Sequence, residues 1–294
     1  MSVRVCVGEL PWCPEGFWMD EYRKRELDTM IKAIDKDFDF IGLYSGRGSV
    51  RIGKSVITMQ DGYYITSEVR RLYKVETPFN EIDNFAFKGD ELIAKAKKLP
   101  PYSVIIYDEA GSDLVGRKFM QATTQALLDF FRECGQLNLF FLCVLPDFFE
   151  LPRPIAINRS TYLVDVDFKE AFTRGKFRFY GPRAKKMLYL LGKHYLDYDA
   201  AKPNFWGSFN NVYTVDENAY RNRKYEALTG RDKDAADKDA KKVTQTHQRM
   251  MDVNDRLIAF LYKDLNVNQE KIAEIVGVTP SSISYRLNKV NGRA

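Results

Sequence analysis

The feature that most restricts how this chain can fold is a set of short, strongly apolar runs separated by helix-length segments. The runs cover residues 38–44, 103–107, 138–145 and 161–166. Strands with nearly continuous Val, Ile, Leu and Phe are buried on both faces, as in parallel sheets covered by helices. The alternation of such runs with helical patterns therefore predicts an α/β fold with a parallel sheet flanked by helices.

Apolar periodicity places the remaining elements. Spacings of three and four residues predict helices over 18–36, 90–98, about 117–135 and 182–195, and a helix that begins at Lys54. A strand is expected near 63–66 and a loop over 203–213. Basic and aromatic residues alternate over 176–180, which predicts a strand with one basic face.

Charge is distributed unevenly along the 294 residues, although the formal net charge is only +5. Residues 1–168 hold 21 basic and 25 acidic side chains, whereas residues 169–229 hold 12 and 6 and residues 230–294 hold 12 and 9. A basic C-terminal part beside an acidic N-terminal part favours contact with a polyanion there. A solvated basic surface is the alternative.

Residues 48–55 read GSVRIGKS and match the pattern GxxxxGK[ST] between an apolar strand and a helix start. In such a loop, backbone N–H groups surround phosphates, the lysine contacts the β- and γ-phosphates, and the hydroxyl binds Mg²⁺. The pattern predicts ATP and Mg²⁺ as cofactors. The predicted nucleotide-binding residues are Gly48, Ser49, Val50, Arg51, Ile52, Gly53, Lys54 and Ser55.

Asp108 and Glu109 directly follow the apolar run 103–107. Two carboxylates at the end of a buried strand need partners or a chemical task. In an ATPase of this kind the first acid holds the Mg²⁺ shell and the second orients the attacking water. Asp108 and Ser55 are therefore the predicted metal ligands, and Glu109, Lys54 and Asp108 the predicted catalytic residues.

With these motifs, residues 38–168 resemble the FtsK/HerA superfamily of DNA-pumping ATPases, and most of all the zonular-occludens-toxin-like and virus or plasmid DNA-transfer ATPases. The resemblance rests on GRGSVRIGKS (46–55), VIIYDEA (104–110) and the run that begins at Asn138. It implies a RecA-like core, a hexameric ring, double-stranded DNA as cargo, and a capsid or transfer channel as partner.

The resemblance also implies two further site residues. A neighbouring subunit would donate an arginine to the γ-phosphate, for which Arg159 is the first candidate, followed by Arg153 and Arg117. The family often has a polar sensor, commonly glutamine, before a proline. Leu145 precedes Pro146 in this chain, so Asp147 is the candidate substitute.

Residues 267–290 have the pattern of a helix-turn-helix. Ile272, Ala273, Ile275 and Val276 give one apolar face, Gly277 permits the turn, and Thr279 with Pro280 begins a second helix. A helix over 256–262 would support them. The expected contacts to double-stranded DNA are Ser281, Ser282, Ser284, Tyr285, Arg286 and Lys289. A protein-binding helical hairpin is the alternative.

These patterns divide the chain into an ATPase core (1–168), a basic aromatic extension (169–229), a charged linker (230–245) and a helix-turn-helix domain (246–294). The extension either lines a nucleic-acid channel or contributes aromatic core with a basic rim. Four scattered cysteines, Cys6, Cys13, Cys134 and Cys143, indicate free thiols rather than a disulfide framework.

The sequence has no apolar run long enough to span a membrane and no signal-peptide pattern, so we expect a cytoplasmic location, in a host cell or a virion if the protein is viral. The expected function is DNA translocation driven by ATP hydrolysis. Two alternatives stay open: a helix-turn-helix regulator switched by nucleotide, and a virion or assembly ATPase that acts on protein.

Overall fold

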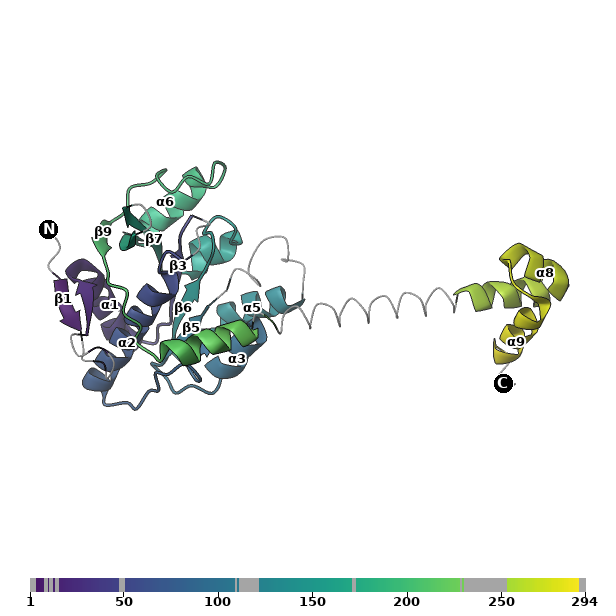
Figure 1. Cartoon of the computed structure of the whole chain (residues 1–294), viewed down its shortest axis with the longest axis horizontal. Helices are drawn as coiled ribbons and strands as arrows, with labels where there is room; N and C mark the ends of the chain where they lie inside the picture. The colour runs from purple at the N-terminus through teal and green to yellow at the C-terminus, as the bar shows by residue number, and fades with distance from the viewer. Residues whose placement is uncertain are drawn as a thin grey trace. The chain divides into compact units, whose positions relative to one another are not determined.

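The computed structural model describes residues 4–7, 10, 13, 16–47, 51–108, 110, 122–170, 173–227, 229 and 253–290. Its contacts divide the chain into two compact units, Met1–Ala227 and Leu228–Ala294 (Figure 1). Each unit has its own core, so each is described by itself.

A seven-stranded sheet organises the first unit, in the order β4-β5-β6-β3-β7-β8-β9. The first five strands in this order, β4, β5, β6, β3 and β7, are parallel to one another. This confirms the predicted α/β class and the four apolar runs as strands. Strands β8 and β9 continue the sheet in the antiparallel sense. The strands are β3 Phe40–Ser45, β4 Phe85–Ala86, β5 Val104–Tyr107, β6 Phe140–Val144, β7 Tyr162–Glu170, β8 Thr173–Tyr180 and β9 Phe205–Ser208.

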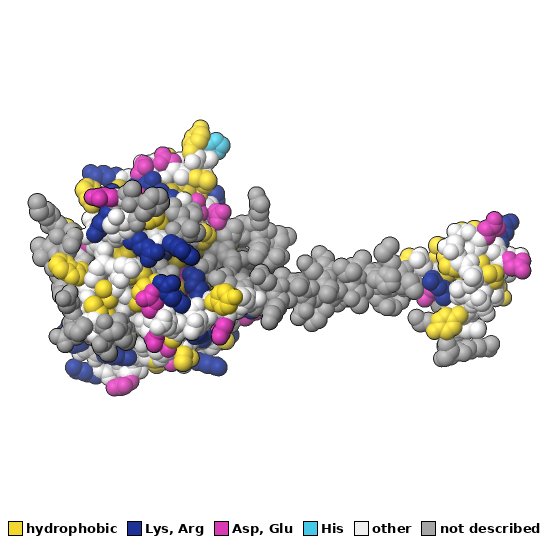
Figure 2. Space-filling model, viewed as in Figure 1, with side chains coloured by type: hydrophobic (Ala, Val, Ile, Leu, Met, Phe, Trp, Pro, Cys, Tyr) yellow, Lys and Arg dark blue, Asp and Glu magenta, His cyan; other side chains and the backbone are white. Residues whose placement is uncertain are grey.

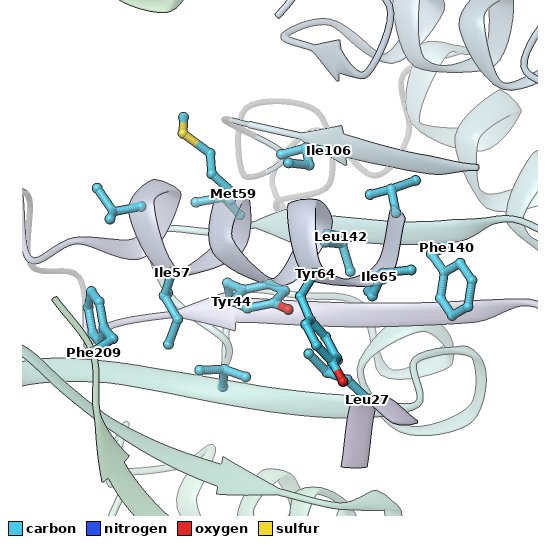
Figure 3. Close-up of a cluster of buried hydrophobic side chains, with 14 of the residues drawn as sticks. Leu27, Tyr44, Ile57, Met59, Tyr64, Ile65, Ile106, Phe140, Leu142 and Phe209 are labelled. Atoms are coloured by element: carbon cyan, nitrogen blue, oxygen red, sulfur yellow. The ribbon is translucent and has the colours of Figure 1, made fainter. Parts of the chain in front are cut away.

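Helices cover both faces of the sheet, because successive side chains of each buried strand point to opposite sides. Tyr44 joins the cluster under α1 (Glu21–Ile34) and α2 (Lys54–Tyr73), whereas its neighbour Leu43 joins the opposite cluster. Figure 3 shows part of this cluster, with Ile57 and Ile65 of α2 among the labelled side chains. The opposite face carries α3 Gly89–Ala96, α5 Ala122–Glu133 and α6 Pro182–Gly192.

Shorter elements complete the first unit. Strands β1 (Arg4–Val7) and β2 (Phe17–Asp20) form an antiparallel hairpin, and Asp20 then caps α1 by accepting a hydrogen bond from the Tyr22 amide at 3.0 Å. The predicted helix over 18–36 thus starts three residues later than expected. A 3₁₀ turn follows α5 (Cys134–Leu137), and a π-helical turn precedes β7 (Pro154–Arg159).

Two predicted elements are wrong. The residues of the expected strand at 63–66 belong to α2. Tyr64 lies one turn beyond the buried Asp61, and Ile65 lies two turns beyond the buried Ile57, so both continue the buried face of the helix. The expected loop at 203–213 contains β9, which pairs with β8 in register Phe179 to Phe205. Local β propensity misled the first prediction, and a long-range pairing decided the second.

The second unit contains a helix over 253–263, α8 (Gln269–Val276) and α9 (Pro280–Val290). Its core is small and consists of Ile258, Ile272, Ala273, Ile283 and Leu287. Gly277 ends α8 in the left-handed conformation with φ of 72°, as the sequence pattern requires of a tight turn. Ile275, which the sequence predicts on the apolar face of this helix, is instead 66% exposed.

Among the described residues, no helix is long and apolar enough to cross a bilayer. Cys13, Cys134 and Cys143 are free thiols, and burial raises the pKa of Cys143 to about 12.

A buried ion pair links α1 and α2 inside the first unit. Arg23 and Asp61 are each 1% exposed, and the Arg23 Nε atom lies 2.5 Å from Asp61 Oδ1. The Tyr44 hydroxyl donates to Asp61 Oδ2 at 2.6 Å and lies 2.9 Å from the Tyr162 hydroxyl. Burial raises the pKa of Asp61, and Arg23 and Tyr44 oppose that rise by stabilising the carboxylate.

We expect Arg23→Met to lower the free energy of unfolding by about 3–5 kcal/mol, because the Asp61 charge stays buried without its partner. Urea unfolding followed by tryptophan fluorescence measures this change. Arg25→Met is the matched control on the same helix, since Arg25 is 67% exposed and its removal should change stability by less than about 0.5 kcal/mol. Equal stabilities of the two variants would contradict a structural role for the pair.

Candidate functional site

The predicted phosphate and metal residues meet at the carboxyl edge of the sheet. Lys54 and Ser55 begin α2 just beyond β3, and Asp108 directly follows β5. The Ser55 Oγ atom lies 3.4 and 3.3 Å from the two carboxylate oxygens of Asp108, although the residues are 53 positions apart. Two sequence motifs therefore form one site, with the Asp108 side chain 1% exposed.

The described part of the 46–55 loop is shaped for a close approach to α2. Gly53 precedes the helix with φ of 99° and gives its first turn no side-chain cap. Ile52 is buried and fills the space over Gly46, where an added Cβ would lie 2.0 Å from Ile52 Cδ1. Ile52 thus belongs to the core, and the missing cap suits an anion at the helix N-terminus.

A charge network fixes the entrance of this loop. Arg47 lies 3.1 Å from Asp199 and 3.8 Å from Asp165, and Arg178 donates to Asp165 Oδ2 at 2.9 and 2.5 Å. Asp165 is on β7 and Arg178 on β8, so the antiparallel extension of the sheet holds the start of the loop in place.

Two residues that the sequence prediction missed contact Asp108. The Tyr220 hydroxyl donates to Asp108 Oδ2, and Lys224 Nζ lies 3.1 Å from the same oxygen. Burial, and then the Asp108 carboxylate, raise the pKa of Tyr220 well above its ordinary value, so the hydroxyl keeps its proton and serves as a donor.

Tyr220 and Lys224 come from a helix over 217–227, which has no strongly apolar face in the sequence. The signals for it were an N-cap and a spacing: Asp216 accepts hydrogen bonds from the Asn218 and Ala219 amides at 2.8 and 3.0 Å, and Tyr220 and Lys224 lie one turn apart. Neither signal indicates which part of the fold the helix contacts.

A pocket of about 550 Å³ surrounds this site. Among its described lining residues, Arg51, Lys54, Arg174, Arg221 and Lys224 are basic and Asp108 alone is acidic. Lys and Arg side chains also gather near the middle of one face of the first unit in Figure 2. The volume lies in the range of ligand pockets, and the excess of positive charge suits a polyphosphate.

Other predicted residues lie elsewhere. Arg159 donates to both carboxylate oxygens of Asp39 at 3.2 and 2.5 Å. Asp39 directly precedes β3, so this pair lies at the amino ends of the parallel strands, whereas Asp108 lies at their carboxyl ends. Asp147 accepts hydrogen bonds from Tyr198 and the Phe149 amide at 2.9 and 2.8 Å, and it does not line the pocket. Arg153 is exposed before the π-helical turn.

Some predicted residues fall outside the described part of the chain, namely Gly48, Ser49, Val50, Glu109 and Arg117, and the side chain of Lys289. The described residues contain no group of three or more His, Cys, Asp or Glu that could hold a metal ion. Ser55 and Asp108 together supply a hydroxyl and a carboxylate, which are oxygen ligands of the type that Mg²⁺ prefers when phosphates complete its shell.

In the second unit, the candidate DNA contacts differ in exposure along α9. Tyr285 is 66% exposed, and Ser281 is exposed at the first turn. Ser282 is partly buried, with its Oγ 2.9 Å from Thr279 Oγ1, and Ser284 is partly buried. Arg286 Nη1 lies 3.4 Å from Asp255, a carboxylate of the preceding helix.

Comparison of the chain with protein-family models, with curated proteins and with solved structures finds no match.

We expect Gly53→Ala to destabilise the first unit by about 1–3 kcal/mol, because an alanine is strained at this φ and its Cβ would lie 3.0 Å from the Phe209 ring. Thermal denaturation measures the change. Gly135→Ala is the matched control, since its nearest neighbour would be 3.9 Å away. A Gly53→Ala variant as stable as Gly135→Ala would show that the loop does not depend on this conformation.

Proposed function

We propose that this chain is a Mg²⁺-dependent ATPase that moves double-stranded DNA. The observation that carries the proposal is the meeting of the α2 N-terminus with Asp108 in a basic pocket, where Ser55 Oγ lies 3.3 Å from the carboxylate. The N-terminus of a helix, a lysine and a hydroxyl–carboxylate pair at the end of parallel strands together match the needs of a nucleoside triphosphate.

The roles follow from position. The first turn of α2 and Lys54 would hold the phosphates, and residues 48–53 would surround them with backbone N–H groups. Ser55 and Asp108 would hold Mg²⁺, which neutralises charge on the β- and γ-phosphates. Glu109, next to Asp108 in the sequence, would orient the attacking water.

Positive charge for the γ-phosphate is available from the chain itself. Arg174 and Arg221 line the pocket, whereas Arg159 is held by Asp39 at the other edge of the sheet. We therefore assign the stabilising charge to the pocket arginines, with Arg159 as a structural clamp between β3 and the turn before β7. Assembly into a hexameric ring stays an implication of the family resemblance.

The second unit supplies the proposed DNA contact. Its three helices pack around Ile272, Ile283 and Leu287, and the Gly277 turn sets α9 against α8. This packing supports the proposal that α9 enters the major groove as the second helix of a helix-turn-helix. Ser281 and Tyr285 are exposed on α9, and Arg286 lies beside them.

We expect Lys54→Ala to reduce ATP turnover by about 100-fold or more, because the variant loses the cation that contacts the transferred phosphate. Glu109→Gln should reduce turnover while nucleotide still binds. Phosphate release with and without double-stranded DNA measures both effects, and DNA should increase the wild-type rate.

Arg71→Ala is the matched control for Lys54→Ala, since Arg71 is 63% exposed near the other end of α2 and pairs with Glu68. Turnover by Lys54→Ala equal to that of Arg71→Ala would contradict the phosphate site. Sequence-specific DNA binding with negligible turnover would favour the regulator, and turnover insensitive to DNA would favour an ATPase that acts on protein.

We expect Arg286→Met to weaken binding to double-stranded DNA and to reduce the slope of log affinity against log salt concentration by about 0.9, the loss of one phosphate contact. Titration of fluorescent DNA at several salt concentrations measures the slope. Lys271→Met is the control, because Lys271 is an exposed cation on α8. Circular dichroism establishes that both variants keep their helices, and identical slopes would contradict a role for α9.

A further inference from the structure

The proposed Mg²⁺ ligand Asp108 holds a cation that belongs to the protein. Lys224 Nζ lies 3.1 Å from Asp108 Oδ2, and the Tyr220 hydroxyl donates to that same oxygen. Ser55 Oγ approaches both carboxylate oxygens at 3.3–3.4 Å. The two residues proposed to hold the metal are thus grouped with an ammonium ion and a phenol.

These contacts come from a helix that is firmly seated. The Tyr220 ring packs edge-on against Phe85 of β4 at 5.5 Å, and Arg223 on the same helix pairs with Glu91 of α3 at 3.0 Å. The Lys224 side chain is 26% exposed. The contacts of Tyr220 and Arg223 hold the helix in place, and the helix in turn places Lys224 beside Asp108.

The Lys224 ammonium and Mg²⁺ would compete for the negative charge of the Asp108 carboxylate. Each is stabilised by the Asp108 charge, and two cations close together repel each other in a site with little water. Since Mg²⁺ prefers six oxygen ligands in a near-octahedral arrangement, a lysine nitrogen has no place in its shell.

We propose that Tyr220 and Lys224 form a latch on Asp108, which binding of Mg²⁺ with nucleotide displaces. This inference rests on the proposed function and assigns residues 217–227 the role of reporting metal and nucleotide occupancy. In the resting chain the latch neutralises a buried carboxylate, and in the loaded chain that carboxylate is released to hold Mg²⁺. Tyr220 and Lys224 act through their contacts with Asp108 and not on the nucleotide itself.

The test compares the affinity of the full chain for a fluorescent, non-hydrolysable ATP analogue in Mg²⁺ and in EDTA. We expect Lys224→Met to increase the ratio of these affinities by about tenfold, the strength of one charge-assisted hydrogen bond to a carboxylate. Tyr220→Phe should shift the ratio in the same direction by a smaller factor. Lys224→Arg, which keeps the cation, should restore the wild-type ratio.

Arg71→Met is the control. Arg71 is 63% exposed near the far end of α2, pairs with Glu68 and is not among the residues that line the pocket, so its loss removes one positive charge without touching Asp108 or the phosphate site. The ratio of affinities in Mg²⁺ and EDTA should then equal that of the wild type.

Hydrogen exchange gives an independent reading of the same event. In the wild type, the analogue with Mg²⁺ should speed amide exchange over 217–227, and the analogue in EDTA should not. An unchanged affinity ratio in Lys224→Met, or slower exchange over 217–227 with Mg²⁺, would overturn the latch while nucleotide binding persists. Absence of nucleotide binding by every folded variant would instead overturn the proposed function, and the competition with it.

Discussion

The buried pair of Arg23 and Asp61 is the interaction on which the arrangement of the first unit depends. It joins α1 to α2, and through Tyr44 and Tyr162 it reaches β3 and β7. A buried charge that loses its partner is costly, so packings that separate Arg23 from Asp61 are disfavoured. Ser55 lies less than two turns before Asp61, and the aim of the α2 N-terminus at Asp108 therefore follows from this packing.

The sequence was informative where the signal is local and continuous. The strands β3, β5, β6 and β7 are nearly apolar throughout because both faces of each are covered, and short runs of this kind are typical of buried parallel strands. The strand predicted at 63–66 was wrong because Tyr and Ile have high β propensity and Asp61-Gly62 reads as a turn, yet α2 continues through Gly62 and this segment. The loop predicted over 203–213 was wrong because β9 forms by pairing with β8, and no local pattern in the sequence encodes that pairing.

The candidate site shows the same limit. Lys54, Ser55 and Asp108 were found because each motif is contiguous and its position after an apolar strand puts it at one sheet edge. Tyr220 and Lys224 were missed because they contact Asp108 from 112 and 116 residues away, on a helix with an ordinary polar sequence. Arg159 was assigned to a phosphate because an arginine's partner cannot be read from sequence, and the fold gives it Asp39, 120 residues distant.

The two borders of the sheet have a consequence for how copies of this chain can meet. At one border lies β4, with two residues, and at the other β9, with four. An open strand recruits another chain through its unpaired backbone groups, and the attraction grows with the length of regular backbone on offer. Borders this short give an incoming strand few hydrogen bonds. Addition of another chain at the borders of this seven-stranded sheet is therefore disfavoured.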